Sequence, residues 1–297
     1  MTESQPVSRR GIVAAGAAMA AGVATAGLSA APAEAAADGA SAQAAATGAA
    51  GSPHHDRAKP TVVLVHGAFA DGSSWAPVTE HLQRWGYTVR SVANPLRGLA
   101  ADAAQLRSVL ATIPGPVVLA GHSYGGAVVT EAAAGVAHVK ALVYVAAFVP
   151  DAGEVLGELS ARFPGSLLDP ALTAVPAPGP DGTPGLDLYI RADRFHPVFC
   201  QDLPASTARE LEAVQRPVSA SAFGDRVTAA AWRTIPSWNL VATRDRGIVP
   251  ELQRFQAKRA GSRTVEIPSS HLPLRSRPGT VAELIRTAAR SVPVSPV

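Results

Sequence analysis

The 297-residue sequence contains a single cysteine, Cys200, and has few aromatic (5%) and few charged (16%) residues. One cysteine excludes an intramolecular disulfide and any zinc or iron–sulfur site built from several cysteines. The formal net charge of +3 is small for this length, and no five basic residues follow one another, so we do not expect binding to nucleic acid. Hydrophobic residues make up 47%, which excludes a disordered polar chain.

The first 35 residues have the pattern of an export signal. Arg9 and Arg10 precede an uncharged stretch rich in alanine and glycine, and Ala33-Glu34-Ala35 is a small-x-small cleavage pattern. The paired arginines favour twin-arginine export, which carries proteins that are already folded. We therefore expect a secreted protein without a stable membrane span after processing. The alternative is an uncleaved anchor, because about 20 apolar residues can span a bilayer.

Residues 36–59 are mostly small and show no helical or strand periodicity, which indicates a flexible linker. From residue 60 to 297, short apolar strands alternate with helices. This alternation predicts an α/β fold with a doubly wound, mostly parallel sheet. The strands are expected at Thr61–Val65, Tyr87–Val92, Val117–Ala120, Ala141–Phe148, Trp238–Thr243 and Thr264–Ile267.

A long insert interrupts this alternation, over about residues 151–236. Six prolines between Phe163 and Pro184 make a regular element improbable there, whereas Ala205–Gln215 and Thr228–Thr234 have helical patterns. We expect a cap of helices and loops, inserted after the sixth strand, that covers the carboxyl edge of the sheet, where such folds bind ligands.

Gly121-His122-Ser123-Tyr124-Gly125 fits the G-x-S-x-G pattern of a nucleophile elbow. In such an elbow the serine lies on a sharp turn between a strand and a helix, and the glycines allow close approach of neighbouring backbone. The motif follows a predicted strand, Val117–Ala120, and precedes an apolar helix, which is the context that the chemistry requires. Ser123 is therefore the candidate nucleophile.

A serine hydroxyl needs a nearby base to become nucleophilic at neutral pH. His271 is the best candidate, because it follows the last predicted strand, where a loop can reach the serine. Four other histidines of the predicted domain are alternatives to it: His66, His122, His138 and His196.

A carboxylate must orient that histidine. Asp245 follows the strand Trp238–Thr243, and the order Ser123, Asp245, His271 is the order expected for this type of fold. Asp151 is the alternative acid, since it also follows a predicted core strand.

An oxyanion hole requires two backbone donors. One is expected at Tyr124, directly after the nucleophile, and the other in the loop after the first strand, with Ala68 as first choice and Phe69 as second.

These segments resemble the α/β-hydrolase superfamily, and within it the small serine esterases similar to plant methylesterases and hydroxynitrile lyases and to bacterial arylesterases. The resemblance rests on residues 66–75 (HGAFADGSSW), 121–126 (GHSYGG), 245–250 (DRGIVP) and His271. It implies a triad of Ser123, Asp245 and His271, with Ala68 and Tyr124 as oxyanion donors and no metal or organic cofactor. Hydroxynitrile lyases of this group have a threonine in place of Gly67 and a lysine in place of Leu272, so both positions favour an esterase.

The sequence thus predicts an exported serine hydrolase that cleaves a small-molecule carboxylic ester or lactone through an acyl-enzyme. Two alternatives stay open. One is a lyase or C–C bond-forming enzyme on the same scaffold, or a perhydrolase side activity of the haloperoxidase type. The other is a non-catalytic ligand-binding protein. The sequence does not indicate the oligomeric state.

Overall fold

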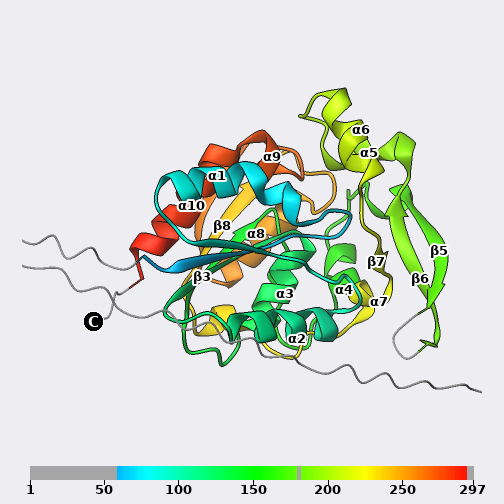
Figure 1. Ribbon diagram of the computed structural model, residues 1–297. Coiled ribbons are helices and arrows are strands. Elements are labelled where there is room, and N and C mark those ends of the chain that lie inside the picture. The colour runs from blue at the N-terminus through cyan, green and yellow to red at the C-terminus, as the bar shows by residue number, and fades with distance from the viewer. Residues whose placement is uncertain (1–58, 179–181, 293–297) are drawn as a thin grey trace, which may run out of the picture. The chain divides into compact units, whose positions relative to one another are not determined.

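The computed structural model describes residues 59–178 and 182–292 (Figure 1). The predicted export signal and all but the last residue of the predicted linker lie outside these ranges, so both stay predictions. Among the helices of the described ranges, none has the length and hydropathy to cross a membrane.

A parallel sheet forms the centre of the described chain. Six strands pair in the order β2-β1-β3-β4-β8-β9, and every pairing is parallel. The inner strands are apolar runs that are buried on both faces, as expected for a sheet covered by helices on both sides. The strands are β1 (Thr61–Val65), β2 (Val89–Val92), β3 (Val117–His122), β4 (Val139–Val145), β8 (Ser237–Ala242) and β9 (Arg263–Ile267).

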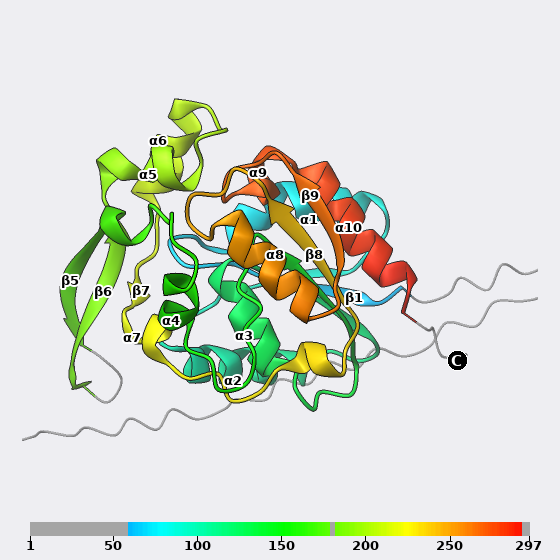
Figure 2. The same ribbon diagram turned by 180° about the vertical axis from the view of Figure 1, so that it is seen from behind.

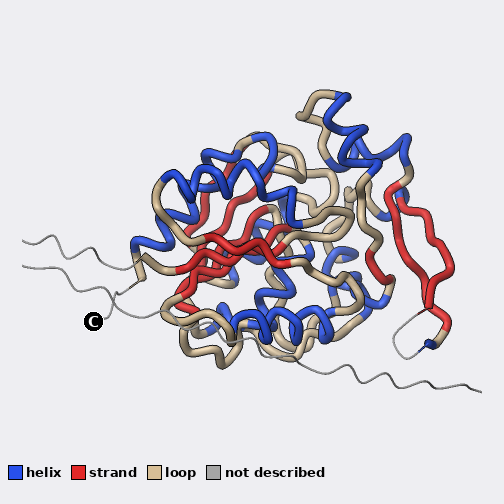
Figure 3. Tube along the Cα trace, in the orientation of Figure 1, coloured by secondary structure: helices blue, strands red, loops and turns tan. Residues whose placement is uncertain are grey.

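Helices cover both faces of this sheet (Figures 1 and 3). α1 (Ala76–Arg84) and α10 (Pro278–Arg290) pack together on one face, and α2 (Leu99–Leu110) and α3 (Tyr124–Ala132) pack together on the other. α10 begins with a proline at its first position and buries one stripe, Val281, Leu284, Ile285 and Ala288. The predicted doubly wound α/β fold is confirmed.

The order of the strands determines where in the sheet the candidate site lies. From β1 the chain winds to one side to form β2 and then to the other side to form β3. Ligands of open α/β sheets bind at such a switch point, beyond the carboxyl ends of the strands. The loop after β1 carries Ala68 and Phe69, and the turn after β3 carries Ser123, so the switch point brings these segments together.

The insert lies between β4 and β8. Four strands of the sheet therefore precede it, and the expectation that it follows a sixth strand is wrong, because the six strands are divided into four before the insert and two after it. Its helices are α4 (Leu156–Ala161), α5 (Ala192–Phe199), α6 (Ala205–Ala213) and α7 (Ser221–Gly224), with short 3-10 turns at Asp169–Ala171 and Ala231–Arg233. Figure 2 shows the insert from the opposite side.

The insert also contains a small antiparallel sheet, which the sequence did not predict. β5 (Leu172–Pro178) pairs with β6 (Pro184–Ile190), and β6 pairs with β7 (Val218–Ser219). The prolines are compatible with it because β5 is an edge strand. Pro176 and Pro178 are two residues apart, so their nitrogens face the same side of the strand and can point away from β6, while Pro184 is the first residue of its strand.

Candidate active site

Ser123 lies on a strained turn between β3 and α3. Its backbone adopts φ 54° and ψ −126°, a conformation that L-residues rarely take and that lifts the serine out of the line of the strand. A Cβ at Gly121 would lie 2.5 Å from the carbonyl oxygen of Gly125, and one at Gly125 would lie 2.6 Å from that of Val65. The two glycines are thus required for the backbone to pack this closely, as the motif predicts.

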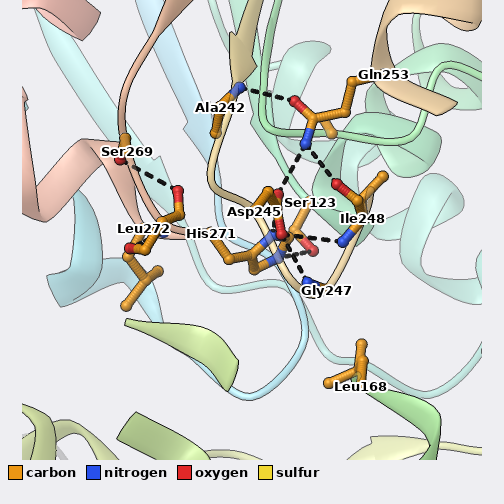
Figure 4. Close-up of polar contacts among 12 residues, drawn as sticks. Ser123, Leu168, Ala242, Asp245, Gly247, Ile248, Gln253, Ser269, His271 and Leu272 are labelled. Carbon is orange, nitrogen blue, oxygen red and sulfur yellow. Dashed lines mark hydrogen bonds and ion pairs between the residues drawn. The ribbon is translucent and has the colours of Figure 1, made fainter. Parts of the chain in front are cut away.

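The three predicted side chains lie in one hydrogen-bonded chain (Figure 4). The Ser123 Oγ lies 2.8 Å from His271 Nε2, and His271 Nδ1 lies 2.7 Å from Asp245 Oδ2. All three residues are buried, with exposed fractions of 6%, 1% and 4% for Ser123, His271 and Asp245. They come from the ends of β3, β8 and β9, which the parallel sheet brings to the same edge.

The buried carboxylate of Asp245 is fully supplied with donors. Its Oδ1 accepts the backbone N–H groups of Gly247 (2.7 Å) and Ile248 (3.0 Å). Its Oδ2 accepts the side-chain amide of Gln253 at 2.8 Å, besides the His271 imidazole. These bonds compensate the cost of burying a charge and hold the carboxylate in one orientation.

Gln253, on α8 (Pro250–Arg259), was not among the predicted site residues. It is wholly buried, accepts the N–H of Ala242 through Oε1, and donates to the carbonyl of Ile248 as well as to Asp245 (Figure 4). It therefore joins the end of β8 to the loop that carries the acid. One glutamine on a predicted helix gives no motif, so the sequence alone had no signal for it.

Asp151, the alternative acid, has a different partner. The Asp151 carboxylate accepts two hydrogen bonds from the guanidinium of Arg233, at 2.8 and 2.5 Å, which hold its pKa below the usual range. Arg246, the residue after Asp245, donates to the carbonyl of Pro197 and makes no ion pair with the Asp245 carboxylate in the part of the chain that the structure describes.

The other histidines have structural partners. His138 and His196 each contact a backbone carbonyl, those of Leu110 and Leu203. His66 supports the loop after β1: its Nδ1 donates to the carbonyl of Gly67, and its Nε2 accepts the N–H of Asn94. Burial lowers the pKa of His66, so the ring is neutral at pH 7.

His122 lies beside the catalytic candidate. It is wholly buried, its ring centroid lies 4.9 Å from that of His271, and its Nε2 donates to the His271 carbonyl at 2.7 Å. Burial and the nearby His271 hold the pKa of His122 well below its usual value. A ring that stays neutral and donates to the backbone supports His271 and does not compete with it for the serine proton.

The residues predicted as oxyanion donors lie at the same edge of the sheet as Ser123. Tyr124 is the first residue of α3, so its N–H has no acceptor within the helix. Ala68 and Phe69 form a turn after β1 and line the same cavity as Ser123 and His271, and Phe69 has a left-handed backbone with φ 59°. The choice between Ala68 and Phe69 as second donor stays a prediction.

A narrow cavity of about 50 Å³ reaches Ser123. Its walls are mainly apolar and come both from the sheet edge and from the cap: Ala68, Phe69, Phe148, Leu168, Phe199, Phe223 and Ile248. Polar groups on its wall include Ser160, Ser166 and the exposed Asp169, besides Ser123 and His271. In the described ranges, no three His, Cys, Asp or Glu side chains are grouped as metal ligands would be.

Known proteins resemble this chain in sequence and in fold. The probable hydrolase R7 of Phoma sp. is 26% identical over 253 residues, which cover 78% of this chain and 98% of the relative. Polyneuridine aldehyde esterase is 20% identical with a TM-score of 0.67, over 77% of this chain and 99% of that structure. A methylesterase from Arabidopsis is 21% identical with a TM-score of 0.64, over 77% and 98%.

The alpha/beta hydrolase family model matches residues 62–284, so the chain belongs to the alpha/beta hydrolase family. This confirms the fold that the resemblance implied and agrees with the expected hydrolase. At identities near 20%, the likeness to the two solved structures defines the fold and not the substrate.

Proposed function

We propose that this protein is a serine hydrolase for small carboxylic esters, with Ser123 as nucleophile, His271 as base and Asp245 as the acid that orients it. One observation carries the proposal: the continuous contact from Ser123 Oγ through His271 to Asp245, at 2.8 and 2.7 Å, beneath an apolar cavity. The named hydrolase and esterase among its relatives support the same class.

The reaction follows from this geometry. Ser123 Oγ attacks the acyl carbon while His271 Nε2 takes its proton, and Asp245 stabilises the imidazolium that forms. The developing oxyanion lies against the N–H of Tyr124 and that of Ala68 or Phe69. His271 then protonates the departing alcohol, and water activated by the same imidazole hydrolyses the acyl-enzyme, which restores Ser123.

The cavity favours a small, uncharged acyl group. Its volume of about 50 Å³ leaves little room beside Ser123, and Phe69, Phe148 and Phe199 offer apolar surface. Trp75 and Phe195 do not line this cavity and are buried in the core. Short-chain acetyl or butyryl esters and lactones of similar size fit this description.

The lyase alternative has less support. A Cβ at Gly67 would lie 2.6 Å from the Cβ of Ser123, so the threonine of hydroxynitrile lyases would require this loop to shift. Leu272 is 1% exposed and apolar, so the charged lysine of those enzymes has no counterpart.

The test is hydrolysis of p-nitrophenyl acetate and butyrate by residues 36–297. We expect turnover by the wild type and a loss of about 10⁶-fold in kcat for Ser123→Ala, as for a removed nucleophile. Ser108→Ala, on the exposed surface of α2, is the matched control and keeps full activity. Equal rates for the wild type and Ser123→Ala would exclude the proposal.

We also propose that the enzyme is exported by the twin-arginine route, from the pattern of residues 1–35. Expression of the full chain in a bacterium with that route is expected to yield mature enzyme outside the cytoplasm. Replacement of Arg9 and Arg10 by lysine is expected to retain the precursor inside, and unchanged export of that variant would refute the route.

A further inference from the structure

The end of α5 and the turn that follows it, in the cap, contact the loops that carry the acid and the base. The side-chain amide of Gln201 donates to the carbonyl of Arg244 at 2.6 Å, next to Asp245. The ring of Phe199 packs against the imidazole of His271, with centroids 5.0 Å apart, and edge-on against Phe69 at 6.2 Å. This segment of the cap is therefore in direct contact with the acid loop, the base and the loop after β1.

Asp202, in this segment, makes a polar contact with the base loop. Its Oδ2 accepts the backbone N–H of Ser270 at 3.0 Å, one residue before His271. Burial alone would raise the pKa of Asp202, but its hydrogen bonds with Ser270 and Ser276 outweigh burial and hold that pKa below the usual value. The carboxylate is thus ionised at neutral pH, which makes the bond to the amide a charge-assisted one.

The backbone around His271 is held from two sides. From the core, His122 Nε2 donates to the His271 carbonyl at 2.7 Å. From the cap, Asp202 accepts the Ser270 N–H. The short turn that presents Asp202 is itself fixed, because the N–H of Leu203 donates to the Cys200 carbonyl and the His196 ring contacts the Leu203 carbonyl.

We infer that Asp202 is a positioning residue for the base. Its contact with the Ser270 N–H links the cap to the base loop and helps to set the distance from His271 Nε2 to Ser123 Oγ. Asp202 does not line the cavity, so it acts through the Ser270 peptide and not on the substrate. The inference rests on the proposed function.

The experiment compares Asp202→Ala and Asp202→Asn with the wild type, using p-nitrophenyl butyrate and the rate of labelling by a fluorophosphonate. Asp193→Ala is the matched control, since Asp193 lies at the start of α5, in the same part of the cap, with its side chain 73% exposed. Loss of a charge-assisted bond that orients the base is expected to lower kcat about tenfold in Asp202→Ala, with KM within about twofold. The labelling rate falls in parallel, because the serine is less activated.

Asp202→Asn is expected to recover kcat to within about threefold of the wild type, because an asparagine oxygen can still accept the Ser270 N–H. Amide exchange at Ser270, followed by NMR, is expected to be slow in the wild type and faster in Asp202→Ala. If the alanine variant does not fold, the asparagine variant and the wild-type exchange rate still decide the matter.

Unchanged kcat in Asp202→Ala, a tenfold loss in Asp202→Asn, or unprotected Ser270 in the wild type would each overturn the inference. A rise in KM alone would also overturn it, since it would assign Asp202 to the cavity. Failure of the proposed function itself would appear separately, as a wild type that neither hydrolyses the ester nor takes the label.

Discussion

Replacement of Asp245 by asparagine tests the orientation of the base most sharply. In the wild type, both oxygens of the carboxylate accept hydrogen bonds. Oδ1 accepts from the N–H groups of Gly247 and Ile248, and Oδ2 accepts from Gln253 and His271. An asparagine has only one oxygen. Because two backbone donors fix it on the Oδ1 side, its NH₂ group takes the place of Oδ2.

That NH₂ group faces His271 Nδ1 as a donor, so the ring must place its proton on Nε2 to accept the bond. A protonated Nε2 cannot take the proton of Ser123. The NH₂ group also opposes the amide of Gln253, which donates to the same place. For a triad acid changed to its amide, the wrong tautomer lowers kcat by about 10⁴, or about 5.5 kcal/mol of transition-state stabilisation.

The assay is kcat for p-nitrophenyl butyrate at pH 7.5, with ¹⁵N NMR of the imidazole to identify the protonated nitrogen. Asp151→Asn is the matched control: it alters the alternative acid, which pairs with Arg233, and is expected to leave kcat unchanged. An Asp245→Asn enzyme that kept a tenth of the wild-type kcat, or a loss as large in Asp151→Asn, would refute this reasoning.

Three further predictions follow from the same contacts. Gln253→Ala removes a donor from Asp245 and leaves buried backbone groups without a partner, so the free energy of unfolding in urea should fall by about 2–3 kcal/mol. The control Gln83→Ala, at an exposed position, should leave that free energy unchanged. Equal stability of Gln253→Ala and the wild type would contradict the prediction. Burial lowers the pKa of His122 and of His66, so as the pH falls the unfolded chain takes up protons before the folded one. The free energy of unfolding is therefore expected to be constant above about pH 6.5 and to fall below that pH by up to about 1.4 kcal/mol per pH unit for each ring. A urea midpoint that is constant from pH 7.5 to 5.5 would be inconsistent with buried neutral rings. Asp169→Asn removes a negative charge from the cavity wall, which repels the free carboxylate of p-nitrophenyl hydrogen succinate. Its kcat/KM for this ester should rise by up to about fivefold, corresponding to about 1 kcal/mol of repulsion, and its kcat/KM for p-nitrophenyl butyrate should not change. Equal effects on both esters would exclude the charge as the cause.

The sequence predicted those parts of the fold that depend on neighbouring residues. Thr61–Val65 is a continuous β-branched run, and the structure has β1 over the same residues. The elbow was recognisable because strand, glycines and serine are adjacent in the chain. Asp245 and His271 were predicted from chain order, since parallel strands bring their carboxyl ends to one edge wherever they lie in sequence.

Other parts depend on contacts between distant segments and were not predictable. Gln253 reaches Asp245 only because α8 packs against β8, and Asp202 reaches Ser270 only because the cap folds back over the sheet. The β5–β6 hairpin was missed because a proline is read as a strand breaker, whereas the edge position that makes Pro176 and Pro178 tolerable is a property of the assembled sheet.

The reactivity of Ser123 is measured most directly by treating the protein with a fluorophosphonate and sequencing the labelled peptide by mass spectrometry. The account predicts one adduct per chain, on the serine of the peptide that contains Gly121–Gly126, and none in Asp245→Asn over the same interval. An active esterase that carries no adduct, or carries it on a different residue, would contradict the account.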